Sequence, residues 1–221
     1  SGTDSFTYTV TDGNGGTDTA AVTITTLSGG GDIPVLTANA DLSAAGSVIP
    51  LEDPTTSSDQ SVTRGTDGWH DFADRNGDGV DDDPVMPSGM DMQGYKLSTS
   101  SDTDINLDLD GGDILNTGGG GTSLQTTGAT TGSGTIRIVN AGSVVVGDLI
   151  TGGGFTVQNV ASGAISLSHD GALTAGTLNT EMTSVKNDIG TACGTITLEG
   201  DANADGVSGD LTVEAINTRN R

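Results

Sequence analysis

The sequence predicts an all-β fold: a short parallel β-helix (a solenoid) with an N-terminal β-hairpin and calcium-binding loops. Three observations lead to this prediction. A motif recurs with a period near 30 residues in the second half of the chain, the 221 residues include only six aromatic side chains, and the acids are 26 Asp against four Glu. Asp suits turns and calcium loops whereas Glu favours helices, so the composition indicates strands joined by metal-binding turns.

We expect three regions along the chain. Residues 1–27 are predicted to form the β-hairpin, and residues 28–102 a linker, a cap and a calcium loop. Residues 103–221 are predicted to form a β-helix of about four turns. A cap is expected because an exposed strand edge invites pairing with other chains.

The repeat is clearest in residues 134–151, which begin Gly-Thr-Ile-Arg-Ile and recur from Gly163 and from Gly194. A weaker copy starts at residue 104. The anchors of the four copies are spaced 31, 29 and 31 residues apart; they are Ile105, Ile136, Ile165 and Ile196. Such a period predicts one supersecondary unit per copy, stacked on its neighbours. An irregular β-sandwich with coincidentally similar strands is the alternative.

Each copy is expected to hold three strand-like pieces, at residues 136–138, 144–150 and 155–157 in the clearest copy. The third piece has expected counterparts at 123–125 and 182–186. Side chains alternate along such strands, so the apolar ones are predicted to point inward while Thr, Ser, Asn and Arg137 point outward. The inward set is Ile136, Ile138, Val144, Val146, Leu149 and Val157.

The Gly-Thr-Ile-x-Ile and Gly-Asp-Leu-x-Thr phrases resemble the filamentous-haemagglutinin type of β-helix, which occurs in large secreted bacterial adhesins. The resemblance covers about half of the chain. It implies an extracellular or cell-surface location and a role in adhesion or surface structure.

The first region contains two alternating runs, residues 4–12 and 17–26, joined by Gly13-Asn-Gly-Gly. This pattern is a strong hairpin signal. The phrase SFTYTVTDGNGG resembles the end of the cadherin-like repeats of giant bacterial surface proteins. A lone hairpin is marginal in water. Its apolar face therefore needs cover, from strands upstream in a longer protein, from the solenoid, or from a neighbouring molecule by strand addition.

The strongest chemical signal is the D-x-N-x-D-G-x-x-D pattern that starts at Asp74. Alternate oxygen-bearing side chains with a glycine at the bend suit one Ca²⁺ ion. Val85 stands where an EF-hand needs Glu, so the phrase instead resembles a thrombospondin type 3-like calcium loop. That resemblance implies side-chain ligands at Asp74, Asn76, Asp78 and Asp82 and a backbone ligand at Val80, with Asp71 able to complete the shell. A solvated acidic loop is the alternative.

A second candidate loop is the two-residue insertion in the fourth copy, with ligand spacing at Asp201, Asn203, Asp205 and Asp210. Calcium at either loop is expected to be structural, because it would neutralise clustered carboxylates and couple binding to folding.

The formal charge of -23 argues against nucleic acid and anionic membranes as partners. No apolar run is long enough for a transmembrane helix. Cys193 aligns with Ser133 and Ser162 before the repeat glycine, so it is interpreted as a small residue at a turn.

The sequence thus predicts a non-enzymatic extracellular building block of a bacterial surface filament, stalk or biofilm matrix, associating with itself or with the rest of a longer surface protein. The alternative is an adhesin segment that binds glycans or other cells. A polysaccharide lyase is a remote alternative, because such sites use basic residues against acidic glycans and this chain has seven, scattered.

Overall fold

The computed structural model describes residues 2–11, 16–26, 32–81, 89–100, 102–128, 132–155, 160–184, 192–201 and 209–218. Within these residues the regular elements are all β-strands and most of the pairing between them is parallel. The all-β class predicted from composition is therefore confirmed.

The strands in the first half of the chain are β1 (Gly2–Thr11), β2 (Thr17–Thr26), β3 (Val35–Leu36), β4 (Ala40–Asp41), β5 (Val48–Ile49), β6 (Leu51–Glu52), β7 (Val62–Thr63), β8 (His70–Asp71), β9 (Met90–Asp91), β10 (Leu97–Ser100) and β11 (Ile105–Asp108). Those in the second half are β12 (Ile114–Leu115), β13 (Thr122–Thr127), β14 (Ile136–Ala141), β15 (Val144–Val146), β16 (Asp148–Ile150), β17 (Gly153–Phe155), β18 (Ile165–His169), β19 (Leu173–Asn179), β20 (Met182–Ser184), β21 (Ile196–Gly200) and β22 (Leu211–Asn217).

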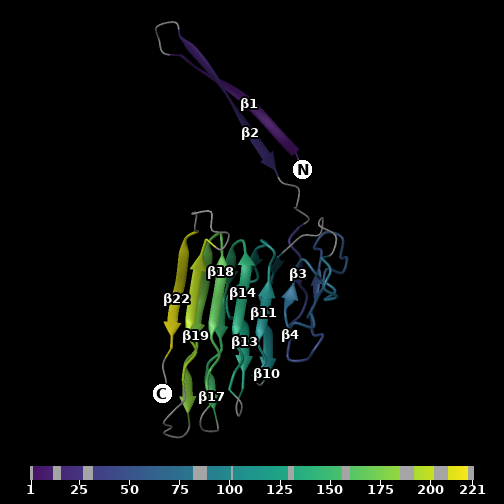
Figure 1. The fold of residues 1–221 in the computed structure, drawn as a ribbon, viewed down its shortest axis with the longest axis vertical. Coiled ribbons are helices and arrows are strands. Elements are labelled where there is room, and N and C mark those ends of the chain that lie inside the picture. The colour runs from purple at the N-terminus through teal and green to yellow at the C-terminus, as the bar shows by residue number, and fades with distance from the viewer. Residues whose placement is uncertain are drawn as a thin grey trace.

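The predicted N-terminal hairpin is present. Strands β1 and β2 pair antiparallel along their full length, with Phe6 opposite Val22. They form a two-stranded sheet of their own and stand apart from the other strands (Figure 1). Part of the predicted connecting turn, residues 12–15, lies outside the described residues.

The repeat anchors pair with one another one copy apart. Ile105 pairs with Ile136, Ile136 with Ile165, and Ile165 with Ile196, all in parallel register. The resulting sheet has the order β21-β18-β14-β11-β8. We call the parallel strands β8 to β22 the stack. Each copy is thus held by backbone hydrogen bonds to the copies before and after it.

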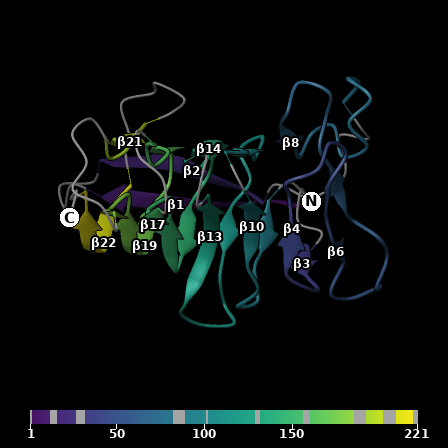
Figure 2. The same cartoon turned by 90° about the horizontal axis from the view of Figure 1, so that it is seen from below.

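A second sheet runs alongside the first. Its strands β12, β15, β19 and β22 pair in chain order, and β13 and β16 pair in the same way before meeting β19. Figure 2 shows the strands succeeding one another along the stack from β22 to β10 and then to β4 and β3. Gly147 separates β15 from β16 in one copy, whereas in the next copy the strand β19 pairs with both of them and is continuous.

One predicted alignment is wrong. Residues 123–125 were expected to match the third strand piece of the next copy, but Leu124 in β13 pairs with Leu149 in β16, after a register shift at Thr122. The other predicted match holds, because β17 pairs with β20 through Gly153 and Met182.

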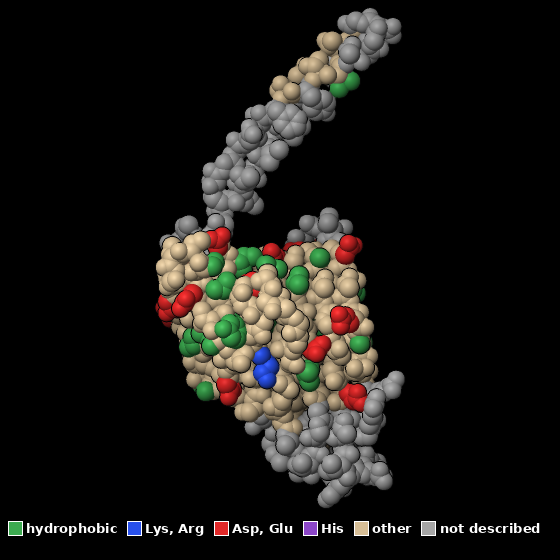
Figure 3. Space-filling model, turned by 180° about the vertical axis from the view of Figure 1, so that it is seen from behind, with side chains coloured by type: hydrophobic (Ala, Val, Ile, Leu, Met, Phe, Trp, Pro, Cys, Tyr) green, Lys and Arg blue, Asp and Glu red, His purple; other side chains and the backbone are tan. Residues whose placement is uncertain are grey.

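The space between the two sheets is filled by aliphatic side chains. Five of the six side chains predicted to point inward are buried (Ile136, Ile138, Val144, Val146 and Leu149), and the sixth, Val157, lies outside the described residues. Burying one such side chain is worth about 2 kcal/mol. Acidic side chains are scattered over the outer surface seen in Figure 3.

Buried hydroxyl groups join the copies at one corner. Thr126, Thr151 and Thr180 are fully buried, and their hydroxyls donate to the carbonyls of Gly134 (2.5 Å), Gly163 (2.5 Å) and Gly194 (2.8 Å), respectively. The repeat glycines are required there, because a Cβ on Gly163 would lie 1.9 Å from the carbonyl oxygen of Gly134.

The serines before these glycines extend the same corner. The hydroxyl oxygen of Ser133 accepts the N–H of Gly163 at 3.1 Å, and that of Ser162 accepts the N–H of Gly194 at 2.9 Å. Cys193 occupies the next position in this series and is half-buried. Its place before the repeat glycine agrees with its interpretation as a small turn residue.

The parallel pairing extends beyond the predicted start of the β-helix at residue 103. Strand β8 pairs with β11, β9 with β12, and β10 with β13. Residues 33–66 then close this end through short strands, of which β3 pairs antiparallel with β6 and β5 with β7. The cap expected within residues 28–102 stays a prediction.

Candidate metal loop and the two ends of the stack

The predicted calcium loop is a tight turn held by its own side chains. The carboxylate of Asp74 is buried and accepts the backbone N–H groups of Gly77 at 3.0 Å and Gly79 at 2.6 Å. Asn76 and Asp78 each accept, at 2.9 Å, the N–H two residues further on. Gly77 and Gly79 have φ of 71° and 84°, a conformation that glycine adopts without strain.

A hollow lies on one side of this loop. Asp67, Asp71, Asp74 and Asp78 line this hollow of about 130 Å³, together with Trp69 and neighbouring glycines. Three of these four were predicted as ligands from the sequence. Asp67 was missed because it precedes the recognisable pattern, and only its position four residues before Asp71 could have indicated it.

A second set of carboxylates lies close to the first. Burial raises the pKa of Asp110, and the charges of Asp108, Asp71 and Asp81 raise it further. Asp71 therefore contributes both to the hollow and to this repulsive group. A bound cation would lower the free energy of such an arrangement, because it neutralises charges that repel one another.

The remaining predicted ligands are only partly placed. The side chain of Val80 is 68% exposed, while Asp82, Asn203 and Asp205 lie outside the described residues. Asp201 follows β21 and Asp210 precedes β22. Across the part of the chain that the structure describes, no group of three or more His, Cys, Asp or Glu side chains has the geometry of a metal site. Both ligand sets therefore remain predictions.

Both histidines are buried in the stack. Burial, followed by the charge of Arg64, lowers the pKa of His70 from its ordinary 6.5 to about 4. Its Nε2 lies 3.4 Å from the hydroxyl of Ser47, and its Nδ1 has no hydrogen-bond partner. The Nδ1 of His169 is 2.8 Å from the carbonyl oxygen of Gly171. Both rings therefore face the protein interior.

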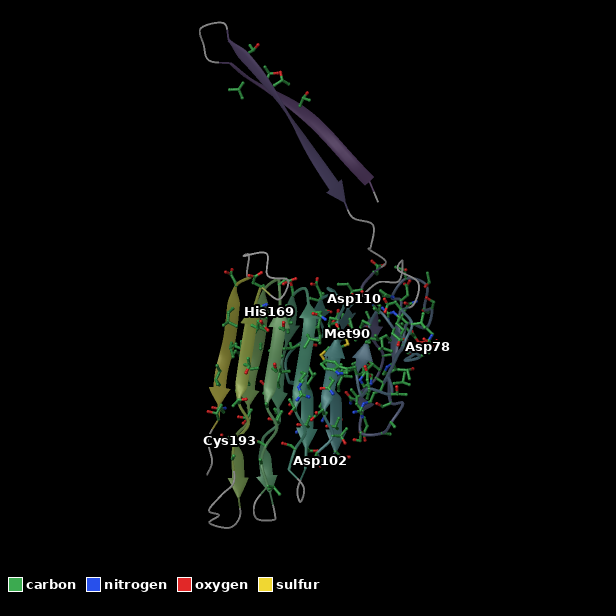
Figure 4. The ribbon with its side chains drawn as sticks, in the orientation of Figure 1. Asp78, Met90, Asp102, Asp110, His169 and Cys193 are labelled. Atoms are coloured by element: carbon green, nitrogen blue, oxygen red, sulfur yellow. The ribbon has the colours of Figure 1, made fainter. Side chains whose placement is uncertain are left out.

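The two ends of the stack differ. At the end formed by residues 33–66, which we call the covered end, the large aliphatic side chains are buried: Leu36, Leu42, Ile49, Leu51 and Val62. At the other end, the open end, β21 and β22 are the last strands of their sheets among the described residues. Asp78 and Cys193 mark the two ends in Figure 4.

Inward side chains of successive strands form in-register rows, here called ladders, that run along the stack to the open end. One ladder runs Leu97, Leu124, Leu149, Leu178 and Ile216, in register from strand to strand. Its first four members are fully buried, whereas Ile216 is 55% exposed. A second ladder ends in the same way at Leu211, which is 57% exposed. These side chains occupy inward positions, and no further copy lies beyond them among the described residues.

A groove crosses the outer face of the second sheet from copy to copy. It encloses about 330 Å³, and its lining includes Gly121, Gly147, Gly176, Asp148 and Glu214. The glycines allow the backbones of neighbouring copies to approach closely here, since a Cβ on Gly147 would lie 2.0 Å from the carbonyl oxygen of Gly121. The groove offers carboxylates, hydroxyls and backbone groups for hydrogen bonding.

Residues 1–25 match the model of a bacterial Ig domain. Such domains are typical of bacterial surface proteins, and cadherin domains, which the sequence suggested here, share their sandwich architecture. The match covers only the β1–β2 hairpin, whereas a complete Ig sandwich has seven or more strands. Searches of curated proteins and of solved structures gave no match to the chain. The described residues include no helix suited to crossing a membrane.

Proposed function

We propose that this chain is a non-enzymatic structural segment of a bacterial surface or extracellular matrix assembly: a calcium-stabilised parallel β-helix that associates with itself. The observation that carries this proposal is the in-register parallel pairing of successive copies. The bacterial Ig match over the hairpin supports a surface location. The likeness of the repeat to filamentous-haemagglutinin β-helices supports the same assignment.

Calcium binding is proposed at the hollow lined by Asp67, Asp71, Asp74 and Asp78. Oxygen ligands and clustered negative charge suit this ion. A ligand that binds only the folded state at 100 times its dissociation constant stabilises that state by about 2.7 kcal/mol.

The calcium proposal is tested by thermal unfolding with calcium, with magnesium and with chelator. Asp78→Asn removes one charge from the hollow but keeps an oxygen for the N–H of Val80. Its matched control is Asp59→Asn, an exposed aspartate that accepts the N–H of Ser61 in the same way, at 3.0 Å. We expect calcium to raise the unfolding temperature of the wild type and the control but much less that of Asp78→Asn. Equal shifts in all three would contradict the site.

Self-association is tested by light scattering and electron microscopy of the purified chain. Assemblies that form with calcium and dissolve with chelator are the expected result. Monomers in every condition would overturn the structural role. They would favour the second candidate, an adhesin segment, for which the groove along Gly121, Gly147 and Gly176 is the specific observation. Its carboxylates Asp148 and Glu214 favour glycans without negative charge, and Glu214→Lys should abolish binding to a glycan array if that candidate holds.

A further inference from the structure

One part of the covered end pairs mainly with itself. Residues 47–64, which we call the lid, contain β5, β6 and β7, and each of these strands is two residues long. Strands β5 and β7 pair antiparallel, with Ile49 opposite Val62, and form a two-stranded sheet of their own. Strand β6 pairs antiparallel with β3, and Arg64 forms a single bridge with His70. The lid is therefore not part of the parallel pairing that joins one copy to the next.

The lid buries aliphatic side chains against the end of the stack. Ile49, Leu51 and Val62 are at most 1% exposed, and they belong to the same hydrophobic core as inward side chains of the copies such as Leu107. Displacing the lid would bring these side chains, and those packed beneath them, into contact with water. An apolar surface that is absent from the closed structure would then appear at this end.

A buried arginine outside the lid holds it in place. Arg75 is 4% exposed, and its Nη1 donates to the carbonyl of Gln60 at 2.6 Å. The carbonyl of Arg75 accepts the N–H of Thr63, also at 2.6 Å. The guanidinium of Arg75 lies 5.7 Å from the ring centre of Phe72, a distance that suits a cation–π contact. Phe72 in turn donates its N–H to the carbonyl of Asp108 in β11, so Arg75 connects the lid to the stack.

The turn that carries Arg75 fixes its position. Asp74 accepts the backbone N–H groups of Gly77 and Gly79, as described above. Gly77 also lies against the lid, because a Cβ at this position would be 3.3 Å from the carbonyl oxygen of Thr63. The turn and the lid therefore meet through both a side chain and the backbone.

Two other side-chain bonds between the lid and its surroundings are longer. The hydroxyl of Ser47 lies 3.4 Å from Nε2 of His70, and Nη1 of Arg64 donates to the carbonyl of Leu42 at 3.4 Å. Hydrogen bonds at this length are weaker than those near 2.8 Å. Arg75, with two bonds of 2.6 Å, is therefore the stronger attachment.

We propose that residues 47–64 open as one unit while the copies stay folded, and that Arg75 is the latch that keeps them closed. Proteins open locally in contiguous units, and units with few bonds to the remainder open most readily. Gly46 and Gly68, which flank the lid, have φ of 69° and 91° and provide hinge positions. This inference goes beyond the proposed function and depends neither on calcium nor on self-association.

Hydrogen exchange of the wild-type full chain, followed by NMR at increasing urea concentrations, tests the lid. The amides of Thr37 and Thr63 report opening, because they donate to Pro50 in the lid and to Arg75 outside it. We expect both to exchange at least about tenfold faster than the amides of β14 and β18, with one shared and shallower urea dependence, since opening the lid exposes less surface than unfolding the chain. Exchange with the rate and urea dependence of β14 would overturn the lid, and so would different urea dependences at the two threonines.

A substitution tests the latch. Arg75→Met removes the bond to Gln60 but keeps an unbranched side chain over Phe72. Exchange at Thr63 should become at least about tenfold faster, whereas exchange in β14 and β18 should not change. Arg75→Lys, which keeps a charged donor, should recover part of the protection. Arg137→Met is the matched control, because it removes a partly exposed arginine from the outer surface of the copies.

Two results would overturn the latch. Unchanged exchange at Thr63 in Arg75→Met would show that Arg75 does not hold the lid. Exchange that becomes equally faster in β14 would make Arg75 a residue of global stability instead. The urea series on the wild type needs no substitution, so it decides on the lid even where Arg75→Met does not fold.

Discussion

The two ends of the stack carry similar aliphatic side chains, which are buried at the covered end and exposed at the open end. At the covered end Leu36, Ile49 and Leu51 are at most 1% exposed, although they lie on strands of only two residues. At the open end Leu211 and Ile216 are more than half exposed, although β22 is among the longest strands of the stack. Strand length therefore does not decide burial here. Burial depends on whether another segment lies beyond the strand.

The largest expected effect comes from truncating one leucine side chain at each end of the stack. Leu51→Ala should lower the free energy of unfolding by about 4 kcal/mol, because it leaves a cavity in a packed region. Leu211→Ala should cost less than about 1 kcal/mol, since that side chain is already exposed. Urea unfolding of both variants measures the contrast. Similar losses would contradict the exposure of Leu211 and would mean that another segment or molecule covers it in solution.

The stacked glycines give a second test. Gly163→Ala should destabilise the chain by about 3 kcal/mol, because the new methyl group meets the carbonyl of Gly134 and the copies on both sides are fixed. Gly194→Ala makes the same clash with Gly163, but no further copy packs on this one among the described residues, so a smaller loss is expected. Gly120→Ala, where a Cβ meets nothing within 4 Å, is the control. Equal losses at Gly163 and Gly194 in thermal unfolding would contradict the freedom assigned to the open end.

The third test is the pH dependence that His70 gives to the covered side of the stack. Its folded-state pKa of about 4 lies below the ordinary 6.5, so the unfolded chain binds the proton first as pH falls. The stabilisation is complete above about pH 6.5 and is lost progressively toward pH 4, by about 3 kcal/mol. Urea unfolding at several pH values should show this slope, and His70→Asn should flatten it. An unchanged slope in the variant would assign the effect to carboxylates.

The smallest expected effect comes from the surface between the ends. Arg137 forms an ion pair with Asp104 of the preceding copy at 3.0 Å, and both side chains are partly exposed. Arg137→Met should therefore cost less than about 1 kcal/mol, and the loss should shrink in high salt. Lys96→Met is a control whose hydrogen bond to the side-chain oxygen of Gln125 involves no opposite charge. A large, salt-independent loss at Arg137 would show that its contribution is packing rather than charge.

Much of this architecture could be predicted from local patterns. The anchors Ile105, Ile136, Ile165 and Ile196 pair as their spacing indicated, and the alternation on either side of residues 12–15 correctly predicted the hairpin. The anchor signal depends on a repeat of about 30 residues, and the hairpin signal depends on alternation along a strand, which fixes which side chains share a face. The D-x-N-x-D-G pattern marks a tight turn in which Asp74 accepts backbone N–H groups, while its calcium ligands stay a prediction.

The sequence by itself determined the copies, their inward side chains and the glycines between them, because each is a local or periodic property. The tertiary structure alone decided that β8, β9 and β10 join the stack, since strands such as His70–Asp71 are too short to show a period. It also decided that Leu124 pairs with Leu149, because a register shift is set by the neighbouring strand. The burial of Leu51 has the same basis, because it requires a segment distant in the sequence to pack against it, and that segment is identified only in the folded chain.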